Sequence, residues 1–217
     1  EGCYYGTTME INGHDYLFEP VEGNKMLAFD MDSFTRKYAV DVPYLVTRGI
    51  TADANDDLWL CGDNKFLYRF DPRTRMGEKT KAFDTVDPGA TSGFDMVYAD
   101  GCVYFGTNPT GSLIKYDIAA DTFTRLYTNG GSYANGLVYK DGYLYAGIYD
   151  VRDSSNQSWK VVKVNVNDTT DVTTLDIVGK MPSGSMFYDA ALAGDLLLFG
   201  GGNSQTQMIA VDPDTMT

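Results

Sequence analysis

The sequence predicts an all-β protein made of repeated four-stranded units. Short apolar runs that end in Asp or Asn recur at intervals of 41, 46, 48 and 47 residues, and their last residues are Asp30, Asp71, Asp117, Asn165 and Asp212. A second apolar run precedes each of these, in most cases directly after a tight turn. Helical periodicity with capping residues is missing from the sequence. The repeat and the turns together predict strands throughout.

The tight turns predict hairpins. Asn12-Gly13, Asp100-Gly101 and Asp141-Gly142 each separate two apolar runs. Such pairs are a strong hairpin signal because both turn positions adopt positive φ, which Asn, Asp and Gly tolerate. Each period then holds a first strand, the turn, a second strand, a loop rich in Gly and Asn, a third strand, and an Asp-containing turn before the fourth. The fourth strands are expected at residues 36–42, 79–83, 124–127 and 172–177.

Units of four strands that repeat every ~40 to 50 residues are typical of β-propeller blades. A single twisted sheet cannot bury both faces, whereas blades stacked around an axis bury them against one another. The predicted blades, in one domain, are residues 1–43, 44–90, 91–131, 132–184 and 185–217. The fifth lacks its outer strand. Either further residues of a larger protein complete the ring, which we favour, or residues 3–11 pair with blade 5 as a closing strand.

Composition excludes several classes of protein. The 217 residues include 43% hydrophobic residues, enough for a packed core, and no apolar run reaches the ~18 needed to span a membrane. With 30 acidic and 17 basic side chains the net charge is −13, which disfavours nucleic acid as a partner. A single His rules out catalysis by two histidines within the chain. We expect a module of a secreted or cell-surface protein.

The three cysteines, Cys3, Cys61 and Cys102, allow at most one disulfide. Their spacing includes no CxxC pair, so a zinc site is not predicted. We expect them to behave mainly as small buried apolar residues.

Several stretches resemble known propellers. Residues 49–72, which include Asp57-Leu-Trp-Leu-Cys-Gly62 and Leu67-Tyr-Arg-Phe-Asp-Pro72, resemble blades of the NHL, virginiamycin-lyase and gluconolactonase-like families. Residues 196–213 look like a kelch repeat, and residues 106–117 are similar to blades of secreted propellers associated with polysaccharide breakdown. The resemblance covers almost the whole chain, implies the propeller fold and assigns no single family. Propellers host many unrelated activities.

In a propeller the first strand of each blade lines the central channel, and two sets of loops open on one face, which usually binds ligands. The expected channel-entry residues are Arg48, Asp95, Asn135 and Tyr188, with Tyr4 or Tyr5 from blade 1. The loops between second and third strands, and the residues beside them, add Asn108, Tyr149, Trp159 and Asn203. Amides and carboxylates beside aromatic rings suit sugars. Alternatively, the polar residues serve turn geometry and Trp159 packs on its own blade.

The gluconolactonase-like resemblance implies a divalent ion at the channel mouth. Glu1, Asn135 and Asp189 match the Glu, Asn and Asp of that family, and ligands with oxygen donors alone suit Ca²⁺. Apart from this ion we expect no cofactor. Asp95, Asp189 and Glu1 could also form the acidic set of a glycosidase, because paired carboxylates catalyse glycoside hydrolysis.

Three functions follow from these patterns. We expect a non-catalytic recognition module that binds a glycan or an extracellular protein on its loop-rich face. The first alternative is a channel-mouth hydrolase or lyase that acts on sugars or lactones. The second is an assembly module, in which the remaining blades or another chain complete blade 5.

Overall fold

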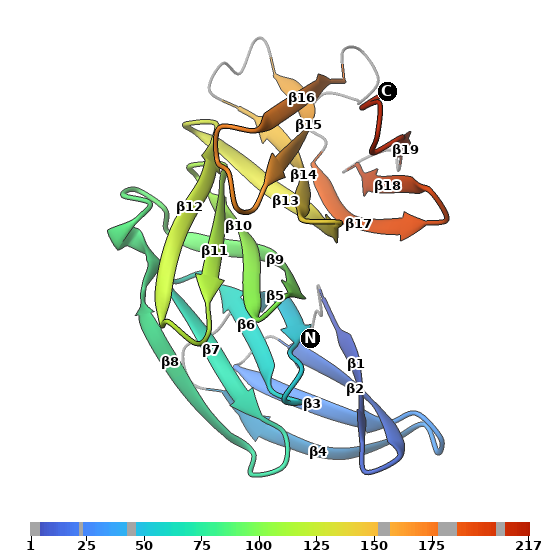
Figure 1. The fold of residues 1–217 in the computed structure, drawn as a ribbon. Helices are drawn as coiled ribbons and strands as arrows, with labels where there is room; N and C mark the ends of the chain where they lie inside the picture. The colour runs from blue at the N-terminus through green and yellow to red at the C-terminus, as the bar shows by residue number, and fades with distance from the viewer. Residues whose placement is uncertain (1–4, 22–23, 43–46, 152–156, 178–185, 203–206) are drawn as a thin grey trace.

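The computed structural model describes residues 5–21, 24–42, 47–151, 157–177, 186–202 and 207–217. These residues form five antiparallel sheets that follow one another around a common axis (Figure 1). Four sheets have four strands and the last has three, as the sequence predicts. The one helix in the described residues is a single 3-10 turn, Phe83–Thr85. The protein is therefore a β-propeller with five blades.

The strands of blades 1 and 2 are β1 (Thr7–Ile11), β2 (His14–Val21), β3 (Lys25–Asp30), β4 (Thr35–Asp41), β5 (Thr47–Ala52), β6 (Leu58–Gly62), β7 (Phe66–Asp71) and β8 (Met76–Ala82). Those of blades 3 and 4 are β9 (Ser92–Ala99), β10 (Cys102–Asn108), β11 (Ser112–Asp117), β12 (Thr122–Thr128), β13 (Ser132–Lys140), β14 (Tyr143–Asp150), β15 (Ser158–Asn165) and β16 (Val172–Asp176). Blade 5 consists of β17 (Phe187–Ala193), β18 (Leu196–Gly201) and β19 (Gln207–Val211). In each blade, strands that are consecutive in sequence pair with one another.

The turns have the backbone geometry that their residues predict. Asn12 and Gly13 have φ of 55° and 79°, and Asp141 and Gly142 have φ of 51° and 82°. Positive φ at both central positions matches the twist of the two flanking strands. These turns fix which side chains of each hairpin face the neighbouring blade.

The acidic residues of the repeat serve the turn between the third and fourth strands. The carboxylate of Asp30 accepts the backbone N–H of Ser33 at 2.8 Å, and that of Asp117 accepts the N–H of Ala120 at 2.9 Å. This bonding pattern replaces a backbone partner within the turn. Part of the negative charge of the chain is thus structural.

The N-terminal strand belongs to blade 1. β1 pairs with β2 from Thr7 opposite Phe18 to Ile11 opposite His14. The alternative in which residues 3–11 close blade 5 is therefore wrong for the described part of that segment. The turn at Asn12-Gly13 instead pairs the backbone of β1 with that of β2.

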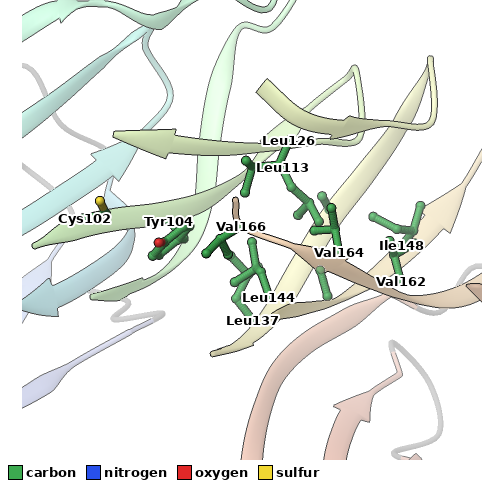
Figure 2. Close-up of a cluster of buried hydrophobic side chains, with 12 residues drawn as sticks. Cys102, Tyr104, Leu113, Leu126, Leu137, Leu144, Ile148, Val162, Val164 and Val166 are labelled. Atoms are coloured by element: carbon green, nitrogen blue, oxygen red, sulfur yellow. The ribbon is translucent and has the colours of Figure 1, made fainter. Parts of the chain in front are cut away.

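Four clusters of buried apolar side chains fill the four interfaces between consecutive blades. Figure 2 shows the cluster between blades 3 and 4, where Tyr104 and Leu113 meet Leu144 and Val162. Among the described residues, none of these clusters joins blade 5 to blade 1. The core is therefore a series of sandwiched layers, each shared by two adjacent blades.

Two of the cysteines behave as the sequence predicts. Cys61 and Cys102 are buried thiols in separate inter-blade clusters and form no disulfide, and Cys3 lies outside the described residues. A search of the described residues finds no helix that is long and apolar enough to cross a membrane.

Candidate functional site

The inner strands of blades 2 to 5 each carry a β-bulge at nearly the same level of the channel. The cross-strand register skips Arg48 in β5, Asp95 in β9, Gly136 in β13 and Tyr188 in β17, and each is the extra residue of its bulge. A bulge bends its strand and redirects the extra residue. Asp95 and Gly136 consequently have positive φ, 35° and 66°. The repeated distortion gathers polar groups from several blades at one place.

A cavity of about 350 Å³ opens at this level. Its lining comes from blades 1 to 5 and consists of Tyr5, Gly6, Ile50, Asp95, Met96, Val97, Leu137, Tyr188, Asp189 and Ala190. Asp95, Tyr188 and Asp189 are residues that the sequence nominates, and Tyr5 is one of the two tyrosines considered for blade 1. The structure brings these four together. It adds apolar walls that sequence reasoning missed, because an inner-strand Ile or Leu looks the same whether it faces a cavity or a neighbouring blade.

Asp95 is the most perturbed acid of the cavity. One carboxylate oxygen accepts the N–H of Leu137 in blade 4 at 2.6 Å, and the other accepts the N–H of Met96 at 2.8 Å. Burial raises the pKa of Asp95 to about 7, the N–H of Leu137 opposes this shift, and the charge of Asp189 adds to it. Asp95 therefore links two blades and can carry a proton near neutral pH.

Hydrogen bonds of Tyr5 in blade 1 and Asn135 in blade 4 connect these two blades to each other and to blade 5. The Tyr5 hydroxyl donates to the carbonyl oxygen of Tyr188 at 3.1 Å and accepts from Nδ2 of Asn135 at 3.2 Å. The same Nδ2 donates to the carbonyl oxygen of Phe187 at 2.9 Å, and Asn135 is only 2% exposed. Burial raises the pKa of Tyr5 far above its usual value, so the phenol stays neutral. Asn135 thus positions the channel strands and does not line the cavity.

Tyr188 and Asp189 are the accessible polar groups of the cavity. Tyr188 is 40% exposed, and Asp189 is also exposed. Asp189 accepts the N–H of Ala190 at 2.7 Å, which fixes the carboxylate beside the opening. An aromatic ring next to a carboxylate offers a stacking face and a strong hydrogen-bond acceptor.

Arg48 and Asn108 lie outside the lining of this cavity. The guanidinium of Arg48 donates to Asp63 at 3.0 Å and lies 5.0 Å from the centre of the Phe94 ring. Nδ2 of Asn108 lies 3.4 Å from Oγ of Ser92, and its buried Oδ1 has no hydrogen-bond partner among the described residues. The Asp63 carboxylate and the Phe94 ring thus hold Arg48 in place, and Asn108 is the last residue of β10.

Tyr149 and Trp159 are packed into the interface between blades 4 and 5. Their rings are stacked with centroids 5.6 Å apart and an angle of 12°, and both are buried. They belong to the cluster that also contains Phe187 and Leu197. Their position matches the alternative in which the Trp packs on its own blade.

Two members of the predicted sets, Glu1 and Asn203, lie outside the described residues. Within the described ranges no group of three or more His, Cys, Asp or Glu residues could hold a metal ion. The Asp189 carboxylate has the chemistry of a calcium ligand, but Asn135 is buried and its amide oxygen lies 3.3 Å from the Tyr5 hydroxyl. These two residues alone do not make a calcium site, and the ion stays a prediction.

No family model and no curated protein matches this sequence. Many solved structures have a similar fold. The chain is 16% identical to a catalytically inactive virginiamycin B lyase from Staphylococcus aureus solved with quinupristin, with a TM-score of 0.65 over 96% of this chain and 69% of that one. It is 11% identical to the WD40 repeats of RRP9, with a TM-score of 0.68 over 93% of this chain and 60% of that one.

A third similar structure is the extracellular domain of a one component system from B. thetaiotaomicron, 16% identical, with a TM-score of 0.67 over 96% of this chain and 27% of that one. At these identities the likeness shows the propeller fold alone. The chain spans between 27% and 69% of the length of the three structures.

Proposed function

We propose that the protein is a non-catalytic recognition module and that the channel-mouth cavity binds a polar ligand of the glycan class. The observation that carries the proposal is the pairing of an exposed aromatic ring, Tyr188, with an exposed carboxylate, Asp189, at the opening of a 350 Å³ cavity. Sugars present hydroxyl groups at their edge and apolar C–H groups on their face, and this pairing complements both.

The inside of the cavity supports the same class of ligand. Asp95 can accept or donate a hydrogen bond near neutral pH, because its pKa is about 7. Ile50, Met96 and Leu137 add an apolar wall, so a ligand with one polar edge and one apolar face fits better than a fully charged one. The net charge of −13 also disfavours anionic ligands.

We propose a secreted or cell-surface location for this module. One structure of similar fold is an extracellular domain, and the sequence resembles blades of secreted propellers. A glycan or an extracellular protein is the partner that suits such a location.

A glycan array probed with the purified protein tests the proposal. Binding is expected in the micromolar to millimolar range, and Tyr188→Ala should weaken it about two- to tenfold, since a lost stacking contact costs about 0.5 to 1.5 kcal/mol. Tyr188→Phe keeps the ring and should retain most of the binding. Asp189→Asn should weaken binding, whereas the control Asp195→Asn, at the other end of the same hairpin, should not. The absence of binding to a broad array contradicts the proposal.

A specific observation favours a second candidate, a hydrolase. Asp95 has a pKa near 7 and lies in the same cavity as Asp189, and glycoside hydrolases use two carboxyl groups that flank the bond they cleave. The test is hydrolysis of chromogenic glycosides and of lactones between pH 5 and 8. Activity that falls as pH rises through 7 and disappears in Asp95→Asn supports the enzyme; binding without turnover supports recognition.

A further inference from the structure

The face of blade 5 that points away from blade 4 is apolar. Along β17, β18 and β19 the residues on this face alternate with those that pack on blade 4, and they are Ala191, Ala193, Leu196, Leu198, Met208 and Ala210. Leu196 is 42% exposed and Met208 is 69% exposed. In blades 1 to 4 the corresponding face is buried against the next blade. The face of blade 5 therefore has the character of an inter-blade surface.

A glycine at one repeated position records how closely the next blade approaches. Gly106 in blade 3, Gly147 in blade 4 and Gly200 in blade 5 hold the same place in the second strand. A Cβ added at Gly106 would lie 2.1 Å from the carbonyl oxygen of Ala134 in β13. A Cβ at Gly147 would lie 2.5 Å from the ring of Phe187 in β17. In both blades only glycine lets the next inner strand pack this closely.

Gly200 has no such neighbour in the described residues. The nearest atom to a Cβ added there is the carbonyl oxygen of Asp189, in its own hairpin, at 3.9 Å. Its φ lies outside the left-handed region that favours glycine. Glycine within a strand is less favourable than Ala, because it loses more conformational freedom on folding. Close packing thus explains Gly106 in blade 3 and Gly147 in blade 4. In blade 5 the group that would pack against Gly200 lies outside the described residues.

The strand that covers this position always comes from the blade that follows in sequence. β9 covers blade 2, where a Cβ on Gly93 would lie 2.8 Å from Cβ of Cys61, β13 covers blade 3, and β17 covers blade 4. We propose that the outer face of blade 5 is covered by the inner strand of a sixth propeller blade. This blade follows blade 5 in the same polypeptide and places a backbone or apolar group directly over Gly200. This inference is independent of the proposed glycan site.

Two further observations agree with this occupant. None of the buried apolar clusters of the described residues joins blade 5 to blade 1, so the described part of blade 1 does not bury the apolar face of blade 5. The chain spans 69% and 60% of the length of the virginiamycin B lyase and RRP9 structures, so proteins of similar fold have longer chains than this one.

The experiment compares Gly200→Val in the 217-residue chain and in the full-length product of its gene. In the 217-residue chain no described atom lies closer than 3.9 Å to the added Cβ, and Val favours the strand, so the melting temperature should stay within about 1 °C or rise. In the full-length product the added side chain meets the covering strand, and the melting temperature should fall by about 2 °C or more, because overpacking a closely packed interface is destabilising. Gly147→Val is the matched control and should destabilise both proteins, since Phe187 is present in both.

Three outcomes overturn the proposal. The first is that the full-length product has no further strand-forming repeat after Thr217. The second is that Gly200→Val changes the melting temperatures of both proteins equally. The third is that the 217-residue chain forms a dimer in sedimentation velocity that Met208→Lys abolishes, which would make a second copy the occupant.

Discussion

At the scale of single residues, Asp95 is the clearest case of a side chain whose chemistry is set by another blade. Its carboxylate lies in β9, but a partner that fixes it is the N–H of Leu137 in β13. Burial raises its pKa to about 7, well above the usual range of an aspartate. The sequence nominates Asp95 as a channel-entry residue, but it cannot reveal this shift, because the burial that causes it depends on how the blades pack together.

The raised pKa predicts how stability depends on pH. The folded protein holds the Asp95 proton more tightly than the unfolded chain does, so this residue makes the protein less stable as pH rises from about 4 through 7. With a folded pKa of about 7, the loss between pH 5 and pH 8 is about 2 to 3 kcal/mol. Asp95→Asn should remove this component. Urea denaturation of both proteins at pH 5 and pH 8 measures it, and parallel pH dependences would refute the prediction.

At the scale of secondary-structure elements, the hairpins follow from sequence and the bulges do not. Asn-Gly and Asp-Gly pairs specify positive φ locally, so the turns are predictable from two adjacent residues. The bulges at Arg48, Asp95 and Tyr188 depend on cross-strand register and on how the inner strands pack around the axis. Phe83 shows a smaller difference of the same kind. The sequence predicts that Phe83 ends the fourth strand of blade 2, but it starts a 3-10 turn and packs against Phe105 in blade 3.

The turn geometry predicts an effect that depends on the backbone alone. Gly142 has φ of 82°, and a Cβ added there would meet no other atom within 4 Å. Gly142→Ala should therefore lower the free energy of unfolding by about 1 to 2 kcal/mol, because an L-residue is strained in that region. The matched control is Gly77→Ala, where φ lies outside that region and the nearest contact is 3.4 Å. Equal stability of the two variants in thermal denaturation would argue against a strained turn.

At the scale of the whole molecule, the repeat predicts the architecture because each four-stranded sheet has apolar faces that it buries against a neighbouring blade. In the described residues each pair of consecutive blades shares one apolar cluster, so blades 2, 3 and 4 each contribute to two clusters and blades 1 and 5 to one. The number of blades follows from the 41- to 48-residue spacing of turn residues such as Asp30 and Asp71. The candidate site is less predictable, because it depends on where the blades converge. Trp159, nominated as a ligand platform, is instead buried between blades 4 and 5.

The layered core predicts that blades can loosen one at a time. Trp159 stacks on Tyr149 and packs in the cluster that holds blade 5 to blade 4. Trp159→Ala should cost about 3 to 5 kcal/mol, and nearest-neighbour coupling should confine the effect to the strands beside that interface. Hydrogen exchange should accelerate in β17 to β19 of blade 5. The strands β9 to β12 of blade 3, on the other side of blade 4, should keep their protection. Phe34→Ala, at a side chain that is 81% exposed, is the control and should change neither region. If exchange accelerates equally in all five blades, the propeller unfolds as a single unit and the clusters are coupled beyond their neighbours.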